Sequence, residues 1–222
     1  LAGANITDKS RCTIEDSPEN ARHGTDMATI LVSPYTGVAP EATLHSYQVS
    51  NSNSVSAGTC KVDGKKLDDF GTLINQAVED GAQIISISQG TGIQGADVKW
   101  AVANAIARGV IIVASAGNTG EDENNTHLGS YSGVVGVSAI NTDGTFASYS
   151  SWGNGVVAAA VGGPFITRDE VTHQPITTRG TSVSAALVAG MLALARQKWP
   201  DATPNQILQS LVHSGLNPDH EW

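Results

Sequence analysis

The 222-residue sequence contains only two cysteines, Cys12 and Cys60. Two thiols are too few for a cysteine-based metal cluster or for a fold held together by disulfides. Whether they form one disulfide or remain free thiols stays open, because the sequence does not show that their Cα atoms approach within the roughly 7 Å that a bridge requires. A hydrophobic core must therefore stabilise the chain, and 40% hydrophobic residues supply one.

Basic residues are also scarce. Twelve Lys and Arg against 21 Asp and Glu leave a formal net charge of -9. The field of such a charge repels nucleic acid and anionic lipid, so we expect neither as a partner.

Long hydrophobic runs are missing as well. No stretch approaches the roughly 18 apolar residues that a membrane-spanning helix needs, so we expect no membrane partner. Residues 1–11 have neither the basic region nor the apolar stretch of a secretory signal. We expect any targeting segment to have been removed or to lie outside this sequence.

The sequence that remains alternates between predicted helices and strands. Residues 84–88 and 110–114 are short apolar strands, and residues 97–108 between them have helical spacing. Apolar strands without polar alternation are typical of a parallel sheet that is covered on both faces. We therefore predict an α/β fold.

The other predicted elements complete one domain over residues 1–222, without internal repeats. They are helices over 24–31, 67–78, 180–198 and 203–215, strands over 42–49, 134–139 and 156–160, and a surface loop over 51–64.

Two segments place a reactive side chain beside glycine at the start of a predicted helix. His23 precedes Gly24, and its near-neutral pKa suits proton transfer, although a lone histidine is more often a surface or structural residue. Ser182 follows Gly180-Thr181 at a helix N-terminus, where unpaired N–H groups stabilise developing negative charge. The ordinary alternative is a serine that only caps the helix.

Asn118 follows the apolar strand that ends at Ala114. Parallel sheets bind ligands at the carboxyl ends of their strands, so an amide there can donate a hydrogen bond to an oxyanion. The ordinary alternative is a turn asparagine.

Together, His-Gly-Thr, Ala-Gly-Asn and Gly-Thr-Ser resemble, in this order, the motifs of subtilisin-like serine peptidases. The resemblance extends over residues 2–215. It implies a three-layer subtilisin-like fold with a mostly parallel sheet and helices on both faces. It also implies hydrolysis of peptide bonds through an acyl-enzyme, with Ser182 as nucleophile, His23 as general base, and Asn118 in the oxyanion hole.

The resemblance further implies where a peptide or protein substrate lies. An edge strand would pair with the substrate backbone, and a second segment would form part of the pocket for the side chain before the scissile bond. The edge strand comprises Ser88, Gln89 and Gly90, and the pocket segment comprises Ala114, Ser115, Ala116 and Gly117. No cofactor is expected; calcium is common in the family, but no set of residues here matches a calcium site.

The sequence departs from the family where the catalytic aspartate is expected, in an Asp-(Ser/Thr)-Gly motif well upstream of the histidine. The acidic residues before His23 follow no apolar strand and are expected in solvated loops: Asp8, Glu15, Asp16 and Glu19. Residues 1–5 resemble what normally follows the motif, so we expect a separate N-terminal segment to supply the aspartate. If it is truly absent, activity would be residual.

A second departure lies just after the nucleophile. Val183 and Ala186 stand where the family usually has Met and Pro. Both are compatible with a helix, so the change indicates a divergent subfamily with a helix start that is less sharply fixed.

Other polar groups have simpler interpretations. The acidic run Glu121-Asp122-Glu123 could favour a basic residue before the cleaved bond or bind a cation, but a solvated loop is the simpler interpretation. The five other histidines lack metal-ligand spacing, so no metal site is assigned.

Two alternatives to a hydrolytic peptidase remain open. One is a peptide-cyclising relative that transfers the acyl group to an amine, and the other is a catalytically impaired scaffold or binding module. A secreted or periplasmic location is favoured over a cytoplasmic one.

Overall fold

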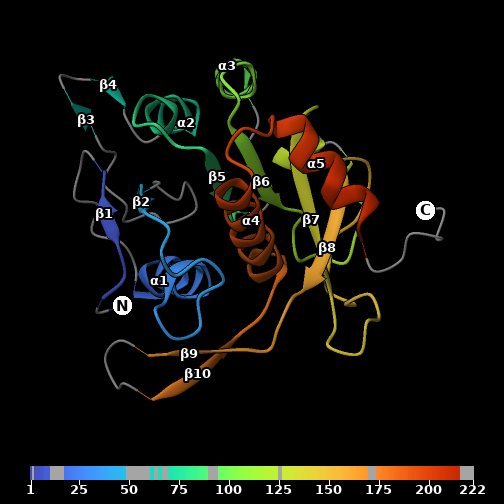
Figure 1. Ribbon diagram of the computed structural model, residues 1–222. Helices are drawn as coiled ribbons and strands as arrows, with labels where there is room; N and C mark the ends of the chain where they lie inside the picture. The colour runs from blue at the N-terminus through green and yellow to red at the C-terminus, as the bar shows by residue number, and fades with distance from the viewer. Residues whose placement is uncertain are drawn as a thin grey trace.

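The computed structural model describes residues 1, 3–10, 18–48, 61–62, 65–66, 70–89, 95–124, 127–169 and 174–215. Its centre is a parallel sheet in the order β5-β6-β7-β8 (Figure 1). The strands are β5 (Ile84–Ile87), β6 (Ile111–Ser115), β7 (Val134–Ile140) and β8 (Val156–Val161). The helices are α1 (Pro18–Val32), α2 (Phe70–Glu79), α3 (Ala96–Ala107), α4 (Thr181–Lys198) and α5 (Pro204–His213).

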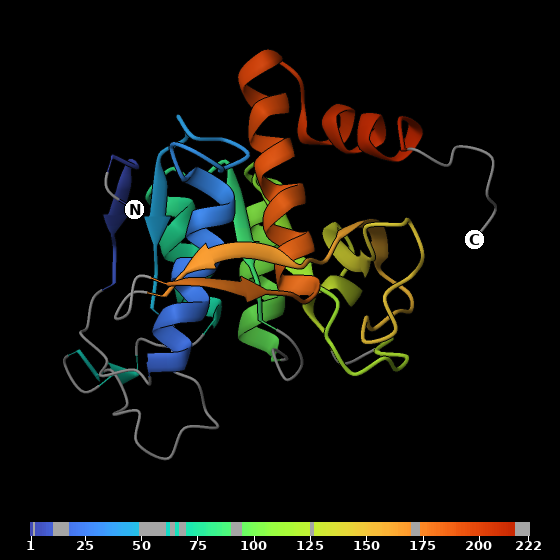
Figure 2. The same cartoon turned by 90° about the horizontal axis from the view of Figure 1, so that it is seen from below.

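Strand β6 shows why both faces of the sheet are covered. All five of its residues are buried, and successive side chains point to opposite faces. Ile112 and Ala114 pack in a cluster with α2 and α3, whereas Ile111 and Val113 pack with α4 and α5. Helices on both sides of the sheet are visible in Figures 1 and 2. The predicted α/β class with a parallel sheet is confirmed.

Two strands lie apart from this sheet. The strand expected over 42–49 is shorter, β2 (Leu44–Ser46), and pairs in parallel with β1 (Ile6–Asp8), which was not predicted from the sequence. Among the described strands, neither β1 nor β2 is hydrogen-bonded to the four-stranded sheet. Figure 1 shows the pair beside α1, beyond β5.

Two hairpins were not predicted either. The pair β3 (Lys61–Val62) and β4 (Lys65–Lys66) lies at the end of the segment expected as a loop: β3 is inside 51–64 and β4 directly follows it. Most of that segment is outside the described residues. The antiparallel pair β9 (Phe165–Arg168) and β10 (Pro175–Thr178) leads into α4. These strands are at most four residues long, so they carry little periodic signal.

Helix α1 begins earlier than predicted. Pro18 occupies its first position, where a proline fits because its missing N–H would have no partner inside the helix. His23 therefore lies in the second turn, rather than before the helix. Glu19, expected in a loop, lies in α1 as well.

Helix α1 packs against the first two turns of α4. Met27 and Ile30 form a buried cluster with Val183 and Ala186, the two residues that depart from the family pattern. His23 precedes Met27 by one turn and shares its face of α1. Because α1 and α4 pack together on one side of the sheet, His23 and Ser182 lie on the same side.

Candidate active site

The chain turns sharply into α4. Gly180 directly precedes the first residue of the helix. Its φ of 146° is a backbone conformation that residues with a side chain rarely adopt. Ser182 is the second helical residue and is 8% exposed, so little of it reaches the surface. The Thr181 N–H donates to Asn118, and the Val183 and Ser184 N–H groups donate to Gly180 O. Within the described part of the chain, the Ser182 N–H makes no such bond.

The end of β5 lies directly against this turn. Ser182 Oγ donates to Ser88 O at 3.1 Å, and Ser88 Oγ donates to Ser182 O at 3.2 Å. The next residue, Gln89, accepts a hydrogen bond from Ser115 Oγ through its backbone oxygen at 3.1 Å. The carboxyl ends of β5 and β6 and the start of α4 therefore meet at one place.

Asn118 is bound to the same turn. Its Oδ1 accepts from Thr181 N at 2.8 Å. The single hydrogen of Thr181 Oγ1 has two acceptors at 3.1 Å, Asn118 Oδ1 and Gly117 O. A Cβ on Gly180 would lie 3.2 Å from Asn118 Nδ2. Because Oδ1 is held as an acceptor, the amide nitrogen is left as a donor beside the segment that precedes Ser182. Asn118 itself is exposed.

His23 is half-buried, and three effects act on its pKa. Burial lowers the pKa, the charge of Asp26 opposes this, and Arg22 lowers it slightly further. Asp26 follows His23 by three residues and is 3% exposed. The net lowering leaves the imidazole neutral near pH 7, ready to accept a proton. Asp26 was not among the predicted site residues, although the i, i+3 spacing on a helix places it on the histidine's face.

The other predicted site residues fall into three groups. Ser88, Gln89, Ser115 and Gly117 join the contacts above. Ala114 and Ala116 are fully buried, and the Ala114 side chain packs in the core under α2 and α3. Gly90 lies outside the described residues, as do both cysteines.

None of the candidate acidic residues upstream of His23 is shown to orient it. Asp8 is exposed on β1, and hydrogen bonds from the Ser10 side chain and backbone lower its pKa. The prediction of a solvated position holds for Asp8, but the residue is in a strand rather than a loop. Glu15 and Asp16 lie outside the described residues, and Glu19 belongs to α1.

The prediction of a solvated loop at 121–123 is wrong for its last residue. Glu121 and Asp122 are exposed, but Glu123 is 7% exposed. The loop folds back because the Glu123 N–H donates to Trp152 O and Trp152 N–H donates to Glu121 O. Glu123 Oε1 accepts from Thr119 Oγ1 at 2.9 Å.

Metal clusters and membrane-spanning helices are both absent from the described residues. No group of three or more His, Cys, Asp or Glu there could hold a metal ion. No helix there is long and apolar enough to cross a membrane.

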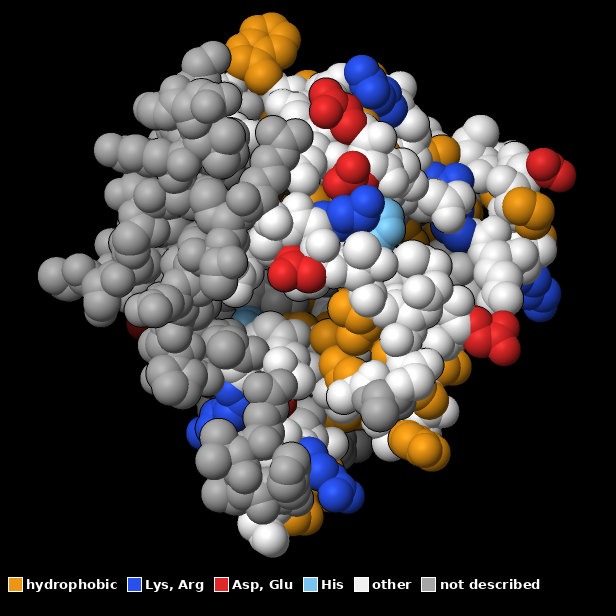
Figure 3. Space-filling view, turned by 90° about the vertical axis from the view of Figure 1, so that its left-hand side faces the viewer, with side chains coloured by type: hydrophobic (Ala, Val, Ile, Leu, Met, Phe, Trp, Pro, Cys, Tyr) orange, Lys and Arg blue, Asp and Glu red, His pale blue; other side chains and the backbone are white. Residues whose placement is uncertain are grey.

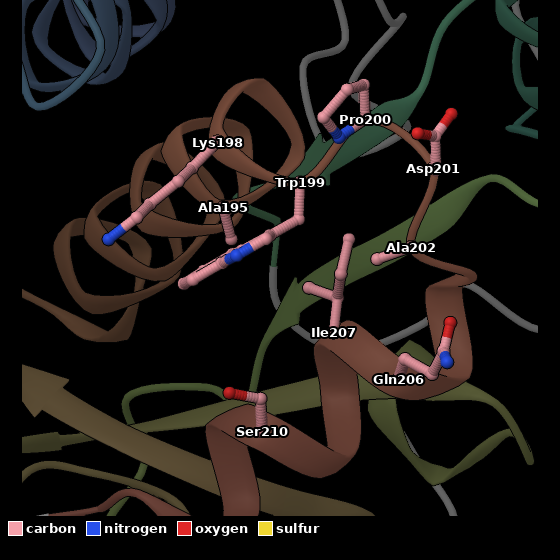
Figure 4. A pocket seen from close by; sticks show the side chains of 9 residues that line it. All are labelled: Ala195, Lys198, Trp199, Pro200, Asp201, Ala202, Gln206, Ile207 and Ser210. Atoms are coloured by element: carbon pink, nitrogen blue, oxygen red, sulfur yellow. The ribbon is translucent and has the colours of Figure 1, made fainter.

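A pocket of about 600 Å³ lies elsewhere, between the end of α4 and α5 (Figure 4). Its lining includes Trp199 and Ile207 of α5. Lys198 Nζ lies over the Trp199 ring, 4.8 Å from its centroid. Ala195, which also lines it, is thirteen residues after Ser182, which is on the order of 20 Å along the helix. This pocket is thus separate from the Ser182 site.

The amino-acid sequence is similar to those of known peptidases. The chain is 30% identical over 204 residues to Subtilisin DY of Bacillus licheniformis, covering 88% of this chain and 70% of that protein. It is 29% identical over 198 residues to the thermostable alkaline protease of Halalkalibacterium halodurans, covering 87% of this chain. The chain spans only 52% of the length of that second relative.

Two relatives have a cellular location in their names, one extracellular and one intracellular. The minor extracellular protease Epr of Bacillus subtilis is 29% identical over 194 residues, covering 85% of this chain and 28% of that protein. The major intracellular serine protease of the same species is 27% identical over 227 residues, covering 97% of this chain and 68% of that protein.

The fold and a family model agree with these matches. The solved structure of the prenylagaramide maturation protease PagA superposes with a TM-score of 0.75 at 25% identity, covering 96% of this chain and 76% of that one. Residues 4–221 match the model of the subtilase family, Peptidase_S8. The chain therefore belongs to the subtilase family of serine peptidases.

Proposed function

We propose that residues 1–222 form one peptidase domain that hydrolyses peptide bonds through an acyl-enzyme on Ser182. The observation that carries the proposal is the start of α4, where the Ser182 hydroxyl lies against the end of β5 and the Asn118 amide lies beside Gly180. A nucleophile and a separate oxyanion donor thus border the same space.

The proposed reaction starts with proton transfer from Ser182 Oγ to the neutral imidazole of His23. The Oγ atom bonds to the substrate carbonyl carbon, and the carbonyl electrons move to an oxyanion held by Asn118 Nδ2 and the Ser182 N–H. Collapse breaks the C–N bond, and the leaving amine takes the proton from His23. Water then attacks the ester in the same way, and the carboxylic acid is released.

Substrate would be held along the end of β5. Extended peptides add to exposed strand edges by backbone hydrogen bonds, so cleavage tolerates varied sequences. Ser88 O, which now accepts from Ser182 Oγ, is a natural acceptor for a substrate N–H. The main chain of residues 114–117 would form one wall for the side chain before the scissile bond.

We also propose that a separate segment supplies the aspartate that orients His23. Among the described strands, β2 pairs only with β1 and β5 only with β6, so each has an unpaired edge. Seen from the β1 and β2 side, a group of hydrophobic side chains is exposed near the middle of this face (Figure 3). An added strand would find backbone hydrogen-bond partners at the two strand edges.

Labelling with a serine-directed fluorophosphonate probe tests the proposal. The complete protein should be labelled at Ser182 and should cleave casein, and both reactions should vanish in Ser182→Ala. An unlabelled but folded protein would instead favour the impaired scaffold. Labelling of this chain should rise on adding the Asp-bearing segment, and an aspartate-to-alanine form of that segment is the matched control.

The proposed chemistry uses only groups of the chain, so we propose that no cofactor takes part. Treatment with EDTA should leave the rate of Ser182 labelling unchanged. A lower rate that added Ca²⁺ restores would show that a metal ion supports the site.

A peptide-maturing role is the second candidate, because the chain resembles a protein named as a maturation protease. Mass spectrometry of products made with an added amine distinguishes hydrolysis from acyl transfer. We further propose an extracytoplasmic location, as the name of the extracellular relative indicates for that protein. Cell fractionation tests it.

A further inference from the structure

The loop after Asn118 brings a carboxylate behind the wall of the proposed substrate site. Gly117, at φ 110°, has no side chain, and a Cβ there would lie 3.9 Å from Glu123 Oε1. It would also lie 2.9 Å from Ser151 Oγ. Glu123 therefore stands next to the main chain of the segment that would receive the side chain before the scissile bond.

Hydrogen bonds fix this carboxylate in place. Thr119 Oγ1 lies 2.9 Å from Glu123 Oε1 and 3.0 Å from Ser151 Oγ, and Ser151 N–H donates to Gly117 O at 2.9 Å. Burial of a carboxylate costs free energy, which these hydrogen bonds partly offset. A solvated loop residue would need none of these contacts.

A buried histidine lies within reach of the Glu123 charge. His127 is 0% exposed, and neither of its ring nitrogens has a hydrogen-bond partner among the described residues. A Cβ on Gly129 would lie 2.7 Å from Nδ1, so the ring packs closely on that backbone. Burial lowers the pKa of His127 despite the charge of Glu123, so the ring is neutral and keeps a lone pair that can accept a hydrogen bond.

Carboxylate and neutral imidazole together suit a group that only donates hydrogen bonds. Lysine ammonium and arginine guanidinium are such groups, and charge-assisted bonds to a carboxylate are the strong kind. The net charge of -9 favours the approach of a cationic peptide. A metal ion fits less well, because no third ligand joins Glu123 and His127 among the described residues.

We propose that Glu123 and His127 form the end of the pocket for the residue before the scissile bond and select a basic side chain there. This inference rests on the proposed peptidase function and names its substrate class. Glu123 determines specificity and takes no part in bond cleavage.

The test compares isosteric peptide substrates on the complete protein. Fluorogenic peptides carry arginine, citrulline or leucine before the cleaved bond, and citrulline keeps the shape of arginine without its charge. We expect kcat/KM for the arginine peptide to exceed that for the citrulline peptide by roughly 30-fold or more. This ratio corresponds to the smallest loss of binding free energy usually seen when one partner of a buried charge pair is removed. Equal values for arginine and citrulline would overturn the inference.

Variants locate the selectivity. Glu123→Gln should lower kcat/KM for the arginine peptide by roughly 30-fold while the leucine peptide changes less than about 3-fold. The matched control is Glu121→Gln, which removes the same charge from an exposed site of the same loop and should leave the arginine-to-citrulline ratio unchanged. A ratio that falls equally in both variants would contradict a local role for Glu123.

Two further measurements keep the outcomes separate. Fluorophosphonate labelling of Ser182 reports whether the catalytic groups are active, because the probe has no side chain to fill the substrate pocket. Protein that is labelled but shows no preference for arginine contradicts this inference and leaves the proposed function intact. Protein that neither labels nor cleaves contradicts the proposed function and this inference with it. If Glu123→Gln fails to fold by circular dichroism, the arginine and citrulline comparison on the unaltered protein still decides.

Discussion

Ser182 Oγ donates a hydrogen bond to Ser88 O over 3.1 Å, and Ser88 Oγ returns one to Ser182 O over 3.2 Å. Ser88→Ala should lower the free energy of unfolding by about 1 kcal/mol, because the returned bond is lost. Labelling of Ser182 should persist, since the Ser88 backbone oxygen remains. Thermal unfolding and labelling rates measure the two effects, and loss of labelling in a folded variant would give the Ser88 hydroxyl a direct part in catalysis.

The Asn118 side chain has two separable roles. Asn118→Ala should lower kcat by about 10²–10³, the magnitude known for loss of an oxyanion-hole amide in subtilisin itself. The variant should also lose about 1 kcal/mol of stability, because Thr181 N–H loses its acceptor. Asn118→Asp keeps the acceptor and removes the donor, so its kcat should fall while its stability stays closer to that of the parent. Retained kcat in both variants would exclude Asn118 from the oxyanion hole.

The turn at Gly180 should depend on glycine for two reasons. In Gly180→Ala the alanine would have to adopt a φ of 146°, and its Cβ would lie 3.2–3.3 Å from Asn118 atoms. We therefore expect the free energy of unfolding to fall by about 1–3 kcal/mol and kcat to decrease. Gly144→Ala is the matched control, because φ is 86° but nothing lies within 4 Å of the new Cβ. It should cost about 1 kcal/mol and leave kcat unchanged. Steady-state kinetics and chemical unfolding distinguish the two.

The pH dependence of kcat/KM should follow the charges around His23. Burial lowers its pKa, so activity should rise with pH with a midpoint below about 6.5. Asp26→Asn removes a charge that raises this pKa, so the midpoint should move to lower pH. Arg22→Gln removes a charge that lowers it, so the midpoint should move up. Shifts in the same direction in both variants would contradict this electrostatic assignment.

Stability should also depend on pH through the buried His127. Its pKa in the folded state lies below the unfolded value of about 6.5, so the unfolded chain binds a proton first as the pH falls. The free energy of unfolding should therefore be highest above pH 6.5 and decrease below it. His127→Gln should show a smaller decrease between pH 7 and 5 in urea titrations, and an unchanged slope would contradict the assignment.

The sequence determined the α/β class and the approximate extents of the main helices and strands. Helix α3 and strand β6 were predictable because each has a strong apolar pattern of its own. The motifs around His23, Asn118 and Ser182 could be named because each combines a reactive residue with glycine in a recognisable order. Short or polar elements such as β1 and β9 were not predictable, because three or four residues carry too little periodicity.

Only the tertiary structure decided which polar groups lie together. Nothing in the sequence distinguishes Glu123 from its exposed neighbours Glu121 and Asp122, and the return of the loop to Trp152 is what buries it. The contacts between Ser88 and Ser182 join residues 94 positions apart, so they depend on the sheet register and on the packing of α4. Local sequence specifies local structure, whereas burial and long-range hydrogen bonds depend on how distant segments meet.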